Sequence, residues 1–227
     1  MKKQSEKAQI LLANRHFQPW EGGEGQVLGQ HVRTHLILGR EALARKDLAC
    51  ALACFSLALD CPENLSEACH LLANRSEIHY WVGEAYAAAG DCGAAFAAWT
   101  IAATFNGDFQ NMRTQSFSEM TYFSALALER LGEKRKAGKL FRELLCYAEM
   151  LHTNEAKIDY FATSLPTMLL FDDELQYCQE TTALFIQAQA QLGLRHPKRA
   201  DKLLQAVLLR DPSHARAHDL LASLRSL

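Results

Sequence analysis

The sequence predicts an all-α protein of antiparallel helix pairs stacked in an irregular right-handed superhelix. One observation is composition: the 227 residues are 49% hydrophobic, rich in Ala and Leu, and include only 5 Pro. Such side chains lose little rotamer freedom in a helix, and a chain of this length buries roughly 70% of its unfolded surface. The other two observations are a recurring pattern of small and large residues and a set of helix-start signals.

The recurring pattern occupies four segments, residues 32–65, 76–109, 118–151 and 181–214. The first expected helix of each carries a small residue, and the second carries a small residue followed four positions later by a large one. These sets are Gly39, Gly83, Ala125 and Ala188; Ala51, Ala95, Ala137 and Ala200; and Phe55, Trp99, Phe141 and Leu204. Small side chains let paired helices approach closely. The pattern is typical of tetratricopeptide repeats.

Helix-start signals agree with this division. Asn64 with Glu67, Asn74 with Glu77, and Ser116 with Glu119 have the spacing of a cap side chain and a carboxylate that satisfy free backbone amides. Pro212 follows the last expected helix, as Pro often does after a helix end.

Two segments fall outside the four units. Residues 1–25 predict one helix, over 5–17, and a Gly-rich loop, so the repeat domain is expected to cover residues 26–227. The long interval before the fourth unit, near residues 152–180, predicts an extra helix pair. Residues 158–164 would form its first helix, and Pro166 would open the second.

Charge and cysteine content narrow the classes of partner. Lys and Arg total 24 against 26 for Asp and Glu, and the short basic run at residues 134–136 fits a solvated helix face, so we expect no nucleic acid. No apolar run is long enough for a signal peptide or a membrane helix, which predicts a cytoplasmic protein without a membrane partner. The seven cysteines include no C-x-x-C pair and are expected to be small buried hydrophobes.

No motif predicts catalysis, a metal or a cofactor. A G-x-S-x-G elbow is missing from the sequence. The pairs His31 and His35, His214 and His218, and Cys50 and Cys54 have the spacing of ligands on one helix face but no third ligand. We interpret them as packing or surface residues, the acidic run at residues 172–174 as a solvated helix end, and the chain as a non-enzyme.

Stacked helix pairs create a concave groove lined by the first helix of each pair. The positions that face it carry aromatic side chains and charges, the combination that protein interfaces favour. The predicted groove residues are Arg33, Arg40, Glu77, Tyr80, Glu84, Glu119, Tyr122 and Phe185. The predicted function is protein or peptide binding by a scaffold of helical repeats.

An alternative function is a carbohydrate site. Trp20, Glu21 and Glu24 in the Gly-rich loop, with Asp159, supply an aromatic ring that could stack on a sugar and carboxylates of the kind that cleave glycosides.

Three stretches carry a family resemblance: FQPWEGGEG at 17–25, NRSEIHYWVG at 74–83 and KIDYFATSLPTMLLFDDE at 157–174. Together they resemble the C-terminal repeat region of large bacterial tetratricopeptide proteins whose N-terminal part is an uncharacterised β-rich, mutarotase-like domain. The resemblance implies that the chain is the tail of that architecture, with an upstream domain or a second copy as a partner. It implies no catalytic residue.

Overall fold

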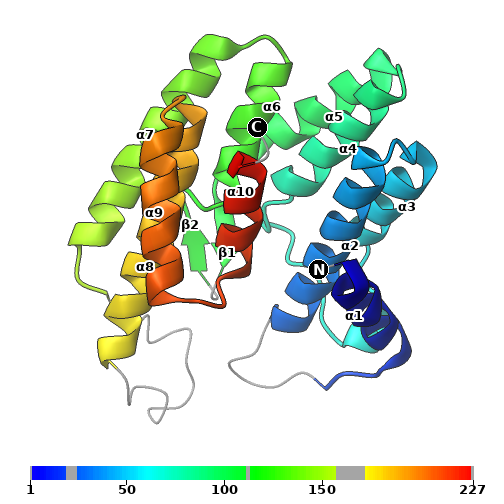
Figure 1. Cartoon of the computed structure of the whole chain (residues 1–227), viewed down its shortest axis with the longest axis horizontal. Helices are drawn as coiled ribbons and strands as arrows, with labels where there is room; N and C mark the ends of the chain where they lie inside the picture. Colours follow the sequence, from blue (N-terminus) through cyan, green and yellow to red (C-terminus); the bar gives the residue numbers. More distant parts are fainter. Residues whose placement is uncertain (1, 19–24, 111–112, 157–171, 226–227) are drawn as a thin grey trace. The chain divides into compact units, whose positions relative to one another are not determined.

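The computed structural model describes residues 2–18, 25–110, 113–156 and 172–225. The chain divides into two compact units, unit 1 (Met1–Thr114) and unit 2 (Gln115–Leu227). Both are helical, which confirms the all-α prediction (Figure 1). Within the described ranges, every helix is too short or too polar to cross a lipid bilayer.

Unit 1 contains two helix pairs preceded by one helix. Helix α1 (Lys2–Asn14) packs on α2 (Gln26–Ala44), which pairs with α3 (Leu48–Leu59). A loop with a short 3-10 helix, η1 (Glu63–Leu65), leads to the second pair, α4 (Ser76–Ala88) and α5 (Cys92–Thr104). Helix α4 also packs against both α2 and α3, so the two pairs share one core.

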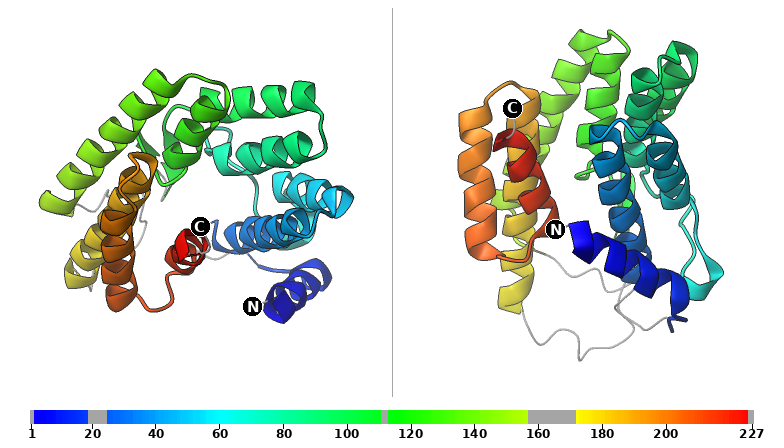
Figure 2. Two further views of the ribbon diagram at one scale, coloured as in Figure 1. Left: turned by 45° about the horizontal axis from the view of Figure 1, so that its top comes forward. Right: turned by 45° about the vertical axis from the view of Figure 1, so that its right-hand side comes forward.

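Unit 2 contains two further pairs and a final helix. Helix α6 (Thr121–Arg130) pairs with α7 (Lys134–Thr153), and α8 (Asp172–Gly193) pairs with α9 (Pro197–Arg210). Helix α8 packs against both α7 and α9, and α10 (Ala215–Arg225) packs on α9 (Figure 2). A two-stranded sheet of β1 (Asp108–Gln110) and β2 (Arg113–Gln115) follows α5 along the chain and belongs to unit 1 except for Gln115, its last residue. The sequence analysis predicted an all-α protein and did not predict these two strands.

The recurring small residues lie where helices touch. Gly39 on α2 faces the ring of Phe55 on α3, and Gly83 on α4 faces the indole of Trp99 on α5, each so closely that a Cβ atom would overlap the ring. The alanines of the second helices are buried as expected: Ala51, Ala95, Ala137 and Ala200. Phe141 differs, because the glycine it contacts is Gly193 on α8, in the following pair.

One of the three predicted helix starts is found in part: Asn74 lies just before α4, but the cap position is Arg75, and the Asn74 backbone amide donates to the Asp108 carboxylate. The Asn74 Oδ1 atom accepts a hydrogen bond from the Ser76 backbone amide at 3.0 Å, where α4 begins. The predicted α6 start is wrong, because α6 begins at Thr121 with Met120 at the cap position. Just before it, the Ser118 hydroxyl accepts from the Met120 amide, and the Thr121 hydroxyl accepts from the Ser118 amide, in place of Ser116 and Glu119.

The third predicted start, Asn64 with Glu67, is wrong because these residues act at long range. The Asn64 side-chain amide donates to the carbonyls of Leu12 and Arg15, at the end of α1. The Glu67 carboxylate accepts from the amides of Gly25 (3.1 Å) and Leu28 (2.6 Å), at the start of α2. A carboxylate at this position also suits the positive end of a helix. The loop between α3 and α4 therefore anchors the end of α1 and the start of α2.

The expected start of a fourth unit near residue 181 is also absent, because α8 runs without a break from Asp172 to Gly193. The predicted helix over 158–164 and Pro166 lie outside the described residues.

Candidate functional site

In unit 1, the predicted groove residues divide by burial. Tyr80 and Glu77 are each only 7% exposed, so they belong to the interior of the unit. Arg33, Arg40 and Glu84 are half-buried and present part of their side chains to solvent. An interaction face in this unit must therefore be built from the charged positions rather than from Tyr80.

The aromatic side chain at this face is Trp81, the neighbour of Tyr80. The Arg40 guanidinium, on α2, lies over the Trp81 ring, on α4, at 4.7 Å from its centroid. Glu84 lies three positions after Trp81, hence on the same side of α4. We call Arg40, Trp81 and Glu84 the α2–α4 surface. A half-buried cation–π pair beside a carboxylate is a combination enriched at protein interfaces.

In unit 2, the predicted groove residues contact other parts of the same unit. Tyr122 is 7% exposed, and its ring packs on Phe123 and Phe141. Glu119 forms an ion pair with Arg216 of α10 at 3.3 Å. Phe185 is buried with Ala217 and Leu221 of α10. The face formed by Glu119 and Phe185 therefore already holds one amphipathic helix, α10.

Sequence reasoning did not find α10 as the occupant of this face. The signal in the sequence is an apolar spacing of four, Ala217 and Leu221, next to Arg216. Such a stripe is common to most surface helices and does not name the face on which it packs.

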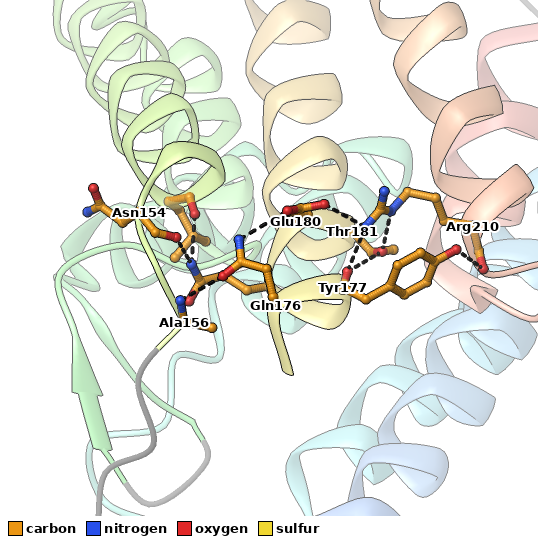
Figure 3. A network of polar contacts seen from close by, with 9 residues as sticks. Asn154, Ala156, Gln176, Tyr177, Glu180, Thr181 and Arg210 are labelled. Carbon is orange, nitrogen blue, oxygen red and sulfur yellow. Dashed lines mark hydrogen bonds and ion pairs between the residues drawn. The ribbon is translucent and has the colours of Figure 1, made fainter. Parts of the chain in front are cut away.

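A polar network connects the N-terminal half of α8 to neighbouring segments of unit 2 (Figure 3). The Arg210 guanidinium donates to the Thr181 hydroxyl, the Tyr177 carbonyl and the Glu180 carboxylate, and lies 3.9 Å from the centroid of the Tyr177 ring. Gln176 donates to Glu180 and accepts from the Ala156 amide. Hydrogen bonds from Gln176 and Arg210 lower the pKa of Glu180, so this carboxylate is ionised at neutral pH. We assign the network a structural role.

The cysteines are not the buried hydrophobes that the sequence predicts. Cys54 alone is buried among the seven, and burial, with Cys50 beside it, raises its pKa to about 11. Cys50, Cys92, Cys146 and Cys178 are exposed, whereas Cys61 and Cys69 are half-buried. All seven are free thiols.

His31 and His35 take part in packing. The His31 Nε2 atom donates to the Leu57 carbonyl, and the His35 Nδ1 atom donates to the His31 carbonyl, because a carbonyl oxygen only accepts. This leaves His35 Nε2 to accept from the Gln9 side-chain amide. Burial lowers the pKa of His35, and this outweighs the hydrogen bond to the His31 carbonyl, which acts in the opposite direction. His35 is therefore neutral in the folded chain.

The second histidine pair does not share a helix. His214 precedes α10, and its ring nitrogen accepts from the Ala217 amide, whereas His218 lies within α10 and donates to the Pro212 carbonyl. Nowhere in the described ranges do three or more His, Cys, Asp or Glu side chains gather as a metal site would require.

Acid is expected to destabilise unit 1 through His35 and His79. Burial lowers the pKa of His79 as well, and the charge of Arg75 adds to this. Both folded-state pKa values lie below the unfolded value of about 6.5. The contribution of these two histidines to stability is therefore fully present above that pH and is lost as the pH falls below it. Urea unfolding at pH 7.5 and 5.5 measures the loss. The variant His35→Gln should reduce it and exposed His16→Gln should not; equal pH dependence in both variants would contradict the assignment.

The residues of the alternative carbohydrate site, Trp20, Glu21, Glu24 and Asp159, lie outside the described residues. A search for protein families that match this chain finds none.

Proposed function

We propose that this chain is a non-catalytic helical-repeat module of the tetratricopeptide type that binds another protein, a peptide or a neighbouring domain through the faces of its first helices. The observation that carries the proposal is the occupied face of unit 2. There, residues predicted as groove residues, Glu119 and Phe185, hold α10 by an ion pair and apolar contacts. Helix-in-groove binding uses this combination.

Unit 1 offers the corresponding face to an external partner. Its α2–α4 surface joins two first helices through Arg40 and Trp81, with Glu84 adding a charge of opposite sign. Ligands suited to it carry an apolar or aromatic side chain flanked by charge. An upstream domain of a longer protein of the resembled architecture, or a second copy, would both be partners of this kind.

The test begins by identifying the partner. A photo-cross-linking amino acid at position 84 should capture one protein, or a second copy, that the same amino acid at exposed position 135 on α7 does not capture. Titration with that partner then measures affinity. Because truncating an interface hot spot costs about 2 kcal/mol or more, Arg40→Ala and Glu84→Ala should each weaken binding at least about tenfold, and Arg135→Ala should leave it unchanged.

Tyr80→Ala and Tyr122→Ala are poor tests, since both tyrosines are buried and their loss would disturb the fold. Unchanged affinity in Arg40→Ala and Glu84→Ala, with native circular dichroism, would overturn the assignment of the α2–α4 surface.

A further inference from the structure

The loop between α3 and α4 brings two thiols to one guanidinium. The Arg75 Nε atom donates to the Cys69 Sγ atom at 3.1 Å, and the Arg75 Nη2 atom donates to the Cys61 Sγ atom at 3.5 Å. The remaining arm, Nη1, donates to the Leu59 carbonyl at 2.9 Å, which fixes the orientation of the guanidinium plane. Two cysteines eight positions apart are thus held side by side, and their thiols also interact with one another.

The surroundings favour oxidation of these thiols over metal binding. A guanidinium beside sulfur stabilises the thiolate, the reactive form of cysteine, and repels a metal cation. Both side chains are half-buried against Leu12, Leu28 and Leu65, so they are packed in place but reachable by a small molecule. We propose that Cys61 and Cys69 form a reversible oxidation site at which a hydroperoxide converts the two thiols into a disulfide.

The geometry assigns a role to each sulfur. Cys69 lies nearer to the guanidinium than Cys61 does, and we assign it as the sulfur that attacks the hydroperoxide. Burial raises the pKa of Cys61, although Arg75 opposes this, so Cys61 is the thiol that reacts second.

The reaction balances without any other reactant. The Cys69 thiolate attacks the terminal oxygen of the hydroperoxide, the O–O bond breaks, and the alkoxide or hydroxide leaves and takes up a proton. The Cys61 thiolate then attacks the Cys69 sulfenic acid, the S–O bond breaks, and water leaves after taking up the Cys61 proton. In total, the two thiols lose two electrons and two protons. An organic hydroperoxide is reduced to an alcohol and one water, and hydrogen peroxide is reduced to two waters.

A disulfide here would act on the anchoring loop. The closed ring, residues 61–69, contains Asn64 and Glu67, which hold the end of α1 and the start of α2. Restricting this ring removes conformational freedom from the unfolded loop. Oxidation is therefore expected to strengthen the attachment of α1 and α2.

The same chain provides a matched control pair. Cys50 and Cys54 are also close together, four positions apart on α3. Burial raises the pKa of Cys54 to about 11, the Asp47 carboxylate adds to this, and Arg45 offsets only a small part. Cys54 is buried, whereas Cys61 is only half-buried, and a buried protonated thiol is a poor nucleophile, so a disulfide within this pair should form slowly.

The experiment treats the reduced full chain with increasing hydrogen peroxide, blocks the remaining thiols by alkylation, and maps all seven cysteines by mass spectrometry. A Cys61–Cys69 disulfide should form first and reverse with dithiothreitol. Cys50 and Cys54 should remain reduced during the peroxide treatment and should therefore be found alkylated. Arg75→Gln should slow the reaction about tenfold, with Arg75→Lys recovering part of the rate, because the cation increases the thiolate fraction. Cys61→Ser should stop at a sulfenic acid on Cys69 that dimedone traps.

Oxidation of Cys50 and Cys54 as fast as Cys61 and Cys69 would overturn the proposal, because the guanidinium would then confer no reactivity. Conversion of Cys69 to sulfinic acid without a disulfide would also overturn it. Circular dichroism of the two Arg75 variants separates a loss of reactivity from a loss of fold. None of these results depends on the proposed partner binding.

Discussion

Replacing Phe141 by alanine is expected to destabilise unit 2 by about 3–5 kcal/mol, the cost of emptying a large buried aromatic site. The Phe141 side chain is 1% exposed and lies against Tyr122 of α6 and Gly193 of α8. Its loss removes contacts between α7 and both neighbours. Urea unfolding gives the free energy, and hydrogen exchange should show reduced protection in α6, α7 and α8.

Phe96→Ala is the control, because Phe96 is 58% exposed on α5. An exposed substitution should change stability by less than about 0.5 kcal/mol. Similar effects of the two substitutions would mean that Phe141 does not occupy the interior of unit 2.

Gly39→Ala is expected to destabilise unit 1 although alanine is the better helix former. A Cβ atom at Gly39 would overlap Cε1 of Phe55 and lie 2.7 Å from its Cδ1 atom, and this ring is fully buried. Overpacking costs about 1–3 kcal/mol, which exceeds the gain of up to about 1 kcal/mol from helix propensity. Thermal and urea unfolding should both show a net loss.

Gly29→Ala on the same helix isolates the propensity term, since no neighbouring atom lies within 4 Å of a Cβ atom there. It should stabilise the chain by about 0.5–1 kcal/mol. Adding Phe55→Leu to Gly39→Ala should cost less than the sum of the two single changes, because the ring that clashes is gone. An additive result, or a stabilising Gly39→Ala, would contradict the contact.

The helix pairs could be predicted because their determinants are local. Small residues at fixed positions, as at Gly39, Gly83 and Ala95, indicate where two helices contact each other closely. The turns between paired helices are short, so each helix has one nearby partner along the chain. The hydrogen bond from the Ser76 amide to Asn74 is local in the same way, since it spans two residues, although Arg75 and not Asn74 is the cap of α4.

The candidate site was harder to predict because a helix packed on two sides has more than one buried face. Helix α4 contacts α2, α3 and α5. Helix α4 is turned about its axis so that Tyr80 lies inside the unit and Trp81 lies beside Arg40. The repeat pattern predicted Tyr80 at the groove instead, because it does not fix the rotation of a helix to within one residue. Long-range contacts such as Glu67 with the start of α2 have no local signal at all.

The sequence by itself determined that this protein is helical, and that glycines and alanines lie where paired helices meet, because propensity and close packing act between near neighbours along the chain. Only the tertiary structure decided which side chains remain accessible, that α10 covers the Glu119 and Phe185 face, and that Cys61 and Cys69 meet at Arg75. These outcomes depend on distances between residues that folding, and not the spacing in the sequence, brings together.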